Sequence, residues 1–293
     1  MADLALPLMQ SHAFQRTCEQ LGLAVTRVDV PGGTCLVQSR RLPLIGSFHL
    51  ASRGPVLEDE RSMPGAIHAV RRQFRGPMVM NAPAYSGSIS GIKIAAGAEL
   101  AMIDLISPSE MRVRLGQKWR NQLKKAERSG LKIKDAPLDA TRDKWFLEAE
   151  AAQQKSRGYK SFPTGFLLAF AAINPGKARL FTASVDNQPV AAMLVLQHGA
   201  MATYQAGVTT ELGRQTCAHN LLLWTIMNDL YAQGIQSLDL GRADLSPGLR
   251  RFKLGSGASI EHLAGSFFSH HLFIGKARTQ TENAQRPELR ARA

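Results

Sequence analysis

Apolar and polar positions repeat with a helical period between Glu110 and about Ser129. Apolar side chains recur there at spacings of three and four residues, at Met111, Leu115, Trp119, Leu123 and Ala126. Ser107, which precedes this segment, is a candidate N-cap, and Pro108 suits a first helical turn. The pattern therefore predicts one amphipathic helix that ends at Gly130.

The opposite arc of this helix is basic. It carries few acids, and its cations are Arg114, Lys118, Arg120, Lys124, Lys125 and Arg128. Because acids are scarce, pairs of opposite charge four residues apart do not account for the pattern. Two interpretations stay open: a solvated helix surface, or a face that contacts an anionic partner.

The remaining periodicities predict helices and strands in both halves of the chain. Further helices are expected at residues 7–22, 64–74, 141–158 and 163–172. Strands are expected at residues 24–30, 34–38, 44–50, 78–80, 100–106, 131–134, 178–185, 190–197 and 201–207. The last three are joined by tight turns, which is typical of antiparallel neighbours. The fold class predicted from this order is α+β, a mixed α/β protein.

After the antiparallel run, a polar loop at 209–216 leads into a helix at 218–233. This helix is apolar almost all the way round, so we expect it to be buried against a sheet. A short strand follows and breaks at Gly241, and the residues up to 255 are expected to form a loop that presents Arg242, Arg250, Arg251 and Lys253. Such a loop suits an anion, because glycine lets the backbone approach closely, although a basic surface turn has the same composition. A last strand is expected at 260–268.

Charge and cysteine content narrow the class of protein. The 293 residues carry a formal net charge of +13, and the sequence pI is about 10.1. This balance favours polyanionic partners such as tRNA, coenzyme A or an anionic membrane surface. The three cysteines show no CxxC spacing, so we expect neither a metal site nor a disulfide framework, and a cytoplasmic location. The sequence contains no apolar run of about 18 residues, so no transmembrane segment is predicted.

Four stretches in a fixed order resemble one family. They are Arg53–Val56 after a strand, Lys118–Glu127 on the basic helix, Pro189–Ala192 with Tyr204 two strands on, and Asp239–Arg242 with Phe252, Lys253 and Gly255. With the antiparallel strands and the buried helix, they make the chain similar to the Fem-like branch of the GNAT acyltransferase superfamily. Characterised members of that branch are peptidoglycan-bridge aminoacyltransferases.

The resemblance implies two tandem GNAT-like domains, each a mixed, largely antiparallel sheet flanked by helices. A degenerate copy would span residues 1–107, an acyltransferase domain residues 108–275, and a basic tail residues 276–293, with the substrate groove between the domains. The implied activity is N-acyl transfer: an amine directly attacks an acyl or aminoacyl group carried by acyl-CoA or aminoacyl-tRNA. No nucleophile on the protein and no tightly bound cofactor are expected.

The resemblance also suggests site residues. Lys253 is expected to stabilise charge, and Asp239 to act as a base or orienting carboxylate, unless it pairs with Arg242 structurally. Tyr204 is a candidate proton donor to the leaving group, and a packed strand tyrosine is the alternative. Arg242, Arg53 and Lys118 are expected to bind substrate.

The donor stays open at this point. Acetyl-CoA-dependent members carry Gln/Arg-x-x-Gly-x-Gly/Ala before the buried helix, whose N-terminus then holds the pyrophosphate. The corresponding segment here is Arg214–His219, which keeps the arginine and lacks both glycines. Arg214 and His219 are expected to contact the donor, whether CoA or tRNA. The alternative function is a non-catalytic protein that keeps a dead transferase fold and binds RNA or an anionic membrane surface.

Overall fold

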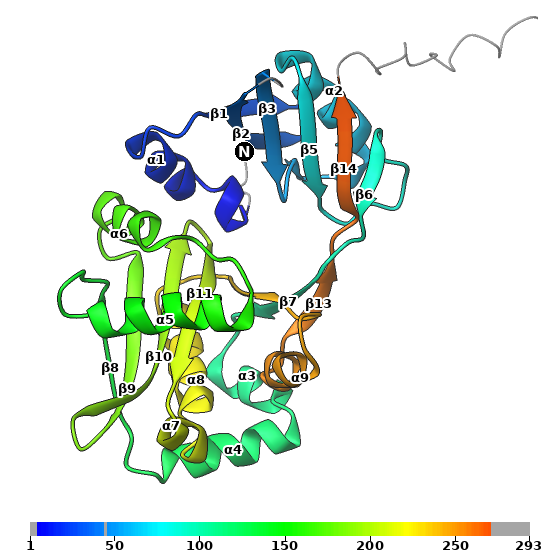
Figure 1. Ribbon diagram of the computed structural model, residues 1–293. Helices are drawn as coiled ribbons and strands as arrows, with labels where there is room; N and C mark the ends of the chain where they lie inside the picture. The colour runs from blue at the N-terminus through cyan, green and yellow to red at the C-terminus, as the bar shows by residue number, and fades with distance from the viewer. Residues whose placement is uncertain (1–4, 44–45, 271–293) are drawn as a thin grey trace, which may run out of the picture.

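Two mixed sheets with helices around them make up the protein (Figure 1). The computed structural model describes residues 5–43 and 46–270. Within these residues each sheet has seven strands. The predicted mixed α/β class with two sheets is therefore confirmed.

The first sheet has the strand order β1-β2-β3-β5-β14-β6, with β4 paired to β2. Its strands are β1 (Val25–Val30), β2 (Gly33–Leu42), β3 (Gly46–Ser52), β4 (Val56–Leu57), β5 (Pro77–Ala82), β6 (Ile92–Ala95) and β14 (Gly265–His270). The helices of this part are η1 (Leu8–Gln10), α1 (His12–Gln20), η2 (Glu60–Ser62) and α2 (Met63–Gln73). Val70 of α2 packs with Val28 and Met78 in a core under one face of the sheet.

The second sheet has the order β13-β7-β12-β11-β10-β9-β8. Its strands are β7 (Glu99–Asp104), β8 (Lys132–Pro137), β9 (Ala178–Val185), β10 (Gln188–His198), β11 (Met201–Thr209), β12 (Ser237–Arg242) and β13 (Ser259–His262). Its helices are α3 (Pro108–Arg114), α4 (Gln117–Glu127), α5 (Lys144–Arg157), α6 (Thr164–Ile173), α7 (Glu211–Gln215), α8 (Ala218–Ala232) and α9 (Pro247–Gly255). All neighbours are antiparallel except β11 and β12, which run parallel.

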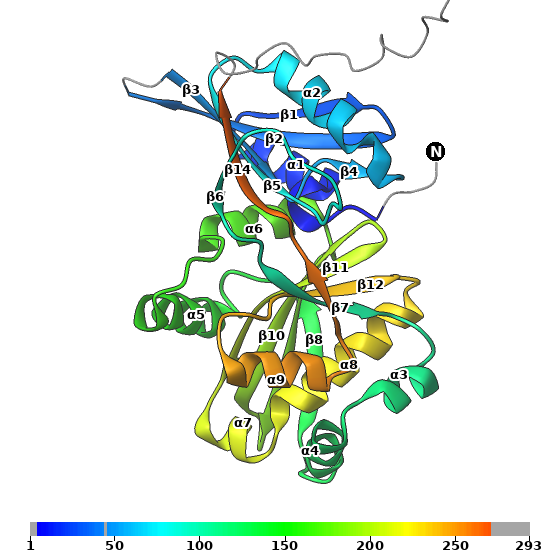
Figure 2. The same ribbon diagram turned by 90° about the vertical axis from the view of Figure 1, so that its right-hand side faces the viewer.

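Two hydrophobic cores cover the two faces of the second sheet. On one face the buried side chains of α4 and α8, including Trp119 and Leu222, pack on the sheet. On the other face α5 and α6 contribute Phe146 and Phe170. This second core also takes in Phe14 of α1, so the two halves of the molecule share apolar contacts. Figure 2 shows α8 and α9 from the side.

The basic helix expected at 110–129 is two helices. A capping box between Ser107 and Glu110 starts α3 as predicted, but the chain becomes extended at Leu115 and Gly116. The amide of Gly116 donates to the carbonyl oxygen of Gly255, 2.9 Å away, which is a contact that the local sequence does not reveal. The expected apolar stripe is otherwise confirmed, because Met111, Leu115, Trp119, Leu123 and Ala126 are all buried.

Two other element predictions were wrong. The residues after Gly241 form helix α9 rather than a loop, because the Ser246 side chain accepts from the Leu249 amide and Pro247 occupies the first turn. An ion pair between Arg250 and Glu99 fastens α9 to β7. The last expected strand is divided into β13 and β14, which lie in different sheets. The chain turns between them at Gly265, whose φ of +131° suits glycine.

Two crossings of the chain connect the sheets. It passes from β6 to β7, and it returns from β13 to β14. The first sheet thus contains a strand from the C-terminal end, while β7 lies in the second sheet before the boundary that we placed at residue 107. The domain limits stay a prediction, and residues 276–293 lie outside the described part. Among the described helices none has both the length and the apolar character needed to cross a membrane.

Candidate functional site

The second sheet opens between β11 and β12. These strands pair only from Met201 opposite Ser237 to Thr203 opposite Asp239, and both continue beyond that point. Next to the opening, β11 has a bulge: Tyr204 and Ala206 face consecutive residues of β10, so Gln205 is an extra residue. A bulge re-aims side chains and leaves its extra residue outside the regular ladder. We call this place the strand opening.

Helix α8 begins beside the end of β11. Its N-cap, Cys217, has a φ of +56°, in the left-handed region that favours glycine. Cys217 occupies the position of the first glycine in the CoA motif, and its backbone has a conformation that glycine adopts readily. A helix N-terminus offers unpaired amides to an anion. The start of α8 therefore has a left-handed residue at the position of the first motif glycine, although that residue is a cysteine.

The two residues expected to contact the donor lie close to this N-terminus. Arg214 on α7 is exposed and pairs with Glu211, and it also donates to the carbonyl oxygen of Thr209. His219 hydrogen-bonds through Nε2 to the carbonyl oxygen of Val208 at 2.9 Å, and burial lowers its pKa. Its ring lies 6.3 Å from that of Phe252 on α9. Helices α8 and α9 therefore approach each other beside the strand opening.

Lys253 is buried on α9. Its side chain is 4% exposed, and Nζ donates to the carbonyl oxygen of Arg242 at 2.7 Å. Burial lowers the pKa of Lys253 to about 8, an effect that Asp239 and Asp244 partly oppose. A lysine held in this way keeps most of its positive charge at neutral pH and lies close to Gly241, two residues beyond Asp239, where β12 ends its pairing with β11.

Asp239 pairs with Arg53 and not with Arg242. Oδ2 of Asp239 accepts from Nη1 of Arg53, and Oδ1 accepts from the amide of Gly241 at 2.6 Å. Arg53 comes from the first sheet's side of the molecule and has a φ of +55°, so its backbone is held in a conformation that non-glycine residues rarely adopt. Arg242 is exposed, and its side chain pairs with Asp244.

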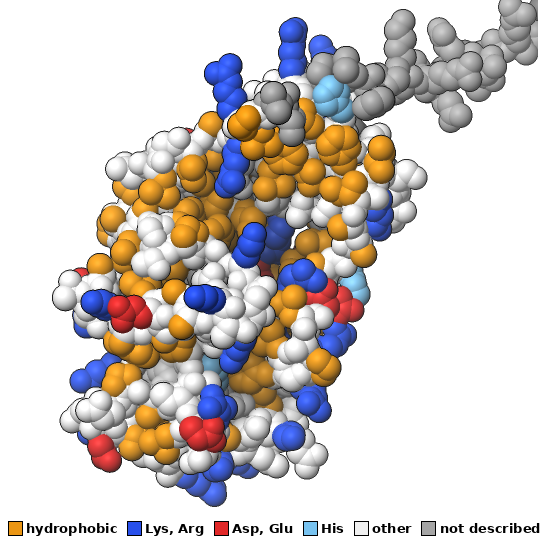
Figure 3. Space-filling view, in the orientation of Figure 1, with side chains coloured by type: hydrophobic (Ala, Val, Ile, Leu, Met, Phe, Trp, Pro, Cys, Tyr) orange, Lys and Arg blue, Asp and Glu red, His pale blue; other side chains and the backbone are white. Residues whose placement is uncertain are grey.

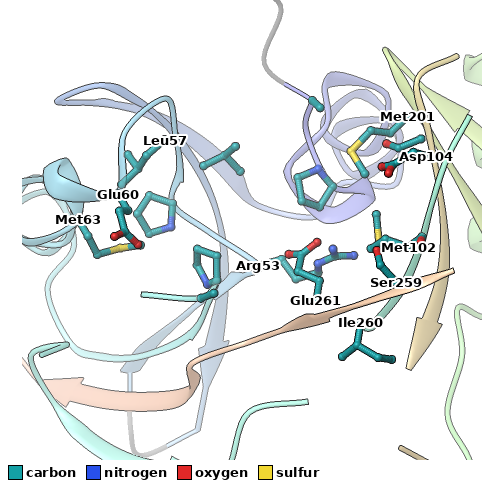
Figure 4. A pocket seen from close by; sticks show the side chains of 17 residues that line it. Arg53, Leu57, Glu60, Met63, Met102, Asp104, Met201, Ser259, Ile260 and Glu261 are labelled. Carbon is teal, nitrogen blue, oxygen red and sulfur yellow. Dashed lines mark hydrogen bonds between the residues drawn. The ribbon is translucent and has the colours of Figure 1, made fainter. Parts of the chain in front are cut away.

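A cavity of about 560 Å³ lies between the two sheets and has Arg53 in its lining. Figure 4 shows Arg53 between Leu57, Glu60 and Met63 on one side and Met102, Asp104, Met201 and Ser259 on the other. Figure 3 shows a hollow between the upper and lower parts of the molecule with Lys and Arg side chains around it. The lining also carries the carboxylates of Glu60, Asp104 and Glu261, so the cavity suits a ligand with a positive group.

Lys118 lies elsewhere. It is exposed on α4, and it lines neither the inter-sheet cavity nor a shallow groove of about 540 Å³ at the end of the same helix. That groove is lined by Asn121, Lys124, Lys125, Arg128 and Ser129. The structure therefore separates the basic helix face from Arg53 and Asp239, which the sequence prediction had grouped with it as one site.

Tyr204 lies near a polar cluster around Glu150 that the sequence analysis missed, and its own ring packs against the core on the α4 and α8 face of the sheet. It is half-buried on β11, and its hydroxyl lies 2.1 Å from where a Cβ on Gly207 would be, so any side chain at that position would displace the tyrosine. Burial raises the pKa of Tyr204, and Glu150 and Tyr159 raise it further. Glu150 is buried on α5 at a spacing of four from Phe146. An acid on an apolar stripe was the signal in the sequence.

Comparisons with known proteins support the resemblance. A family model described as an acetyltransferase (GNAT) domain matches residues 114–254. The segment includes every candidate site residue except Arg53. A search of curated proteins gives no match. Among the described residues no three His, Cys, Asp or Glu side chains gather as metal ligands would.

Solved structures share the fold over both halves of the chain. The crystal structure of FemX is similar with a TM-score of 0.71 and 13% identity, over 89% of this chain and 92% of that one. L-PGS from Bacillus licheniformis has a TM-score of 0.55 and 14% identity, over 89% of this chain and 87% of that one. The C-terminal domain of a protein described as a putative lysylphosphatidylglycerol synthetase, from Agrobacterium fabrum, has a TM-score of 0.54 and 15% identity, over 89% of this chain and 88% of that one. The predicted tandem GNAT-like fold is thus confirmed.

Proposed function

We propose that the protein is an N-acyltransferase that moves an acyl or aminoacyl group from an activated donor directly to an amine. The observation that carries the proposal is the strand opening between β11 and β12, which has the N-terminus of α8 on one side and the buried ammonium of Lys253 on the other. The GNAT domain in residues 114–254 supports the same class of reaction.

In this proposal the donor lies between α8 and α9. Its anionic part is held by the amides at the N-terminus of α8, where the helix dipole also favours negative charge. Its reactive carbonyl reaches the strand opening. The amine nitrogen attacks the carbonyl carbon, the C=O electron pair moves onto oxygen, and the Lys253 ammonium stabilises that oxyanion. When the intermediate collapses, the bond to the thiol or ribose oxygen breaks, and the leaving group takes a proton from the new ammonium.

The other predicted residues take supporting roles. The ion pair between Arg53 and Asp239 holds the first sheet's loop against β12, so Asp239 orients the site rather than accepting a proton. Tyr204, beside the bulge, is placed to hydrogen-bond a substrate. The side chain of Arg242 pairs with Asp244 at the surface. Arg242 therefore contributes through its backbone carbonyl oxygen, which accepts a hydrogen bond from Lys253.

Acyl-CoA and aminoacyl-tRNA are the two candidate donors. The GNAT domain and the left-handed Cys217 favour CoA, because they supply the backbone of a pyrophosphate site. The basic face of α4 and the net charge of +13 favour tRNA. A lysylphosphatidylglycerol synthetase, by its name, joins a lysyl group to a lipid, and it shares the fold.

A thermal-shift titration separates the donors. A donor that binds the folded protein raises the unfolding midpoint by mass action. We expect either acetyl-CoA or charged tRNA to raise it and to support transfer to an amine. Lys253→Met should keep the shift and lose transfer, whereas full activity in that variant would overturn the assignment of Lys253.

The non-catalytic alternative rests on the cations of α4. Lys118, Lys124, Lys125 and Arg128 form no ion pair within the described residues. If the protein only binds RNA or an anionic membrane surface, binding falls steeply with salt and no donor is consumed. Acyl transfer by the wild-type protein rejects this alternative.

A further inference from the structure

A carboxylate is buried close to the strand opening, and the proposed function does not use it. Glu150 is 3% exposed. Its Oε1 accepts from the Tyr159 hydroxyl at 2.9 Å and from Gln154 at 3.3 Å, and its Oε2 accepts from Gln153 at 3.2 Å. All three donors are uncharged. Within the described residues no Lys, Arg or His lies within salt-bridge distance of this carboxylate.

The cluster is attached to the bulged strand. Gln153 also donates to the carbonyl oxygen of Gly207 on β11, at 3.1 Å. In the same region Gln205, the extra residue of the bulge, donates to Ser161 at 2.7 Å. The Tyr204 hydroxyl makes no hydrogen bond to any described residue, and Glu150 and Tyr159 act on it electrostatically. Helix α5 and the segment after it therefore form a polar wall against the bulge.

A buried carboxylate without a cation is costly unless a partner arrives. An acceptor amine enters the reaction as an ammonium, must be held close to the carbonyl carbon, and must lose a proton before it can attack. The Glu150 cluster meets these needs, since it places an anion beside the bulged strand among uncharged donors that a cation can replace.

We propose that Glu150 binds the ammonium group of the acceptor substrate and takes its proton. The inference rests on the proposed function and names the acceptor class, a primary amine. The ammonium replaces one glutamine amide on the carboxylate. One proton passes from nitrogen to Glu150, the freed lone pair attacks the donor carbonyl carbon, and the second proton leaves with the thiol or alcohol. Glu150 then returns its proton to water.

The pH dependence has a defined direction. Burial raises the pKa of Glu150, and the hydrogen bonds from Tyr159, Gln154 and Gln153 oppose that shift. Arg157, on the same helix, also lowers it, and Tyr204 on β11 interacts with Glu150 electrostatically. Because the base works only when ionised, kcat/KM should rise with pH through this raised pKa.

Glu150→Gln keeps the size of the side chain and an oxygen that can accept from Tyr159. We expect kcat/KM for transfer to n-butylamine to fall by about 100-fold or more, as for the loss of a general base, and the acidic limb of the pH profile to disappear. The donor-induced thermal shift should not change. Glu148→Gln is the matched control, because Glu148 is exposed on the same helix, and it should behave as wild type.

Tyr159→Phe provides a second variant if Glu150→Gln folds poorly. It removes one hydrogen bond to the carboxylate, so the acidic limb should move to higher pH while transfer persists. Transfer by Glu150→Gln within twofold of wild type, or an unchanged limb in both variants, overturns the inference.

A measurement without donor separates the two proposals. With ¹³C in the glutamate carboxylates, and the Glu150 signal assigned by its loss in Glu150→Gln, the pKa of Glu150 is titrated with n-butylammonium or tetramethylammonium. We expect only n-butylammonium, which has N–H groups, to lower it. No change contradicts the inference even in an active transferase. A change without transfer from either donor contradicts the proposed function instead.

Discussion

Lys253→Met should raise stability while it abolishes activity. The pKa of Lys253 falls from an ordinary 10.5 to about 8, chiefly through burial. At about 1.4 kcal/mol per pH unit, keeping this side chain charged in the folded state costs on the order of 3 kcal/mol. Methionine removes that cost but leaves the Arg242 carbonyl without its donor, at about 1–3 kcal/mol. The balance predicts a variant about 0–2 kcal/mol more stable than wild type at pH 7.

The pH dependence gives the sharper test. The unfolded lysine binds its proton more tightly than the folded one, so the unfolded state holds more protons between pH 8 and 10.5. Wild-type stability therefore gains from rising pH in this window, and the variant lacks this gain. Between pH 7 and pH 9.5 the advantage of Lys253→Met should shrink by about 2 kcal/mol.

Urea unfolding at several pH values measures this difference. Lys155→Met, on the exposed side of α5, is the control and should show no such trend. Acyl transfer by Lys253→Met should fall by about 100–1000-fold, as for the loss of an oxyanion donor. A stability difference that stays constant from pH 7 to 9.5 would refute the burial of a charged lysine at this position.

Three further substitutions test the surroundings of the site through urea or thermal unfolding. Asp239→Asn should lower the free energy of unfolding by about 3–5 kcal/mol, because Arg53 then stays buried without its counter-charge. Adding Arg53→Met should restore part of this loss. A loss below about 1 kcal/mol would count against a buried ion pair. Cys217→Gly should stabilise the protein by about 1 kcal/mol, because glycine adopts the left-handed backbone without strain. The variant should keep the donor-induced shift of the unfolding midpoint. A midpoint unchanged from wild type without donor would mean that cysteine fits there without strain. Arg71→Met should stabilise the protein by about 1–3 kcal/mol. Arg71 is 6% exposed, and its guanidinium nitrogens have no hydrogen-bond partner among the described residues. A variant less stable than wild type would contradict this reasoning.

Local periodicity predicted the elements whose packing depends on one face. The stripe from Met111 to Ala126 is buried as expected, because spacings of three and four fix which side of a helix is apolar wherever the helix docks. The helix break at Gly116 could not be found in this way, since it follows from a hydrogen bond to Gly255. Helix α9 was missed for a different reason: a loop was expected up to residue 255, although a proline that follows a serine N-cap can start a helix.

The sequence pointed to candidate site residues within single recognisable segments, but it did not show which of them contact one another. Lys253 and Asp239 stood in a recognisable stretch, but the partner of Asp239 is 186 positions away, and nothing near Arg53 in the sequence indicates the ion pair. Cys217 shows the converse. Its residue type breaks the glycine motif, whereas its φ of +56° lies in the left-handed region that favours glycine. A pattern of residue types therefore does not report a backbone conformation that another residue can also adopt.

Two buried ionisable side chains lie on opposite faces of the second sheet, and their pKa values are shifted in opposite directions. Glu150 on α5 packs on the face covered by α5 and α6, and burial raises its pKa. Lys253 on α9 lies on the face of α4 and α8, and burial lowers its pKa to about 8. In the reaction that we propose, environments that move two pKa values apart in this way suit Glu150 as the base and Lys253 as the cationic stabiliser. Direct transfer needs an amine and a carbonyl to meet, and the strand opening is where groups from the two faces can do so.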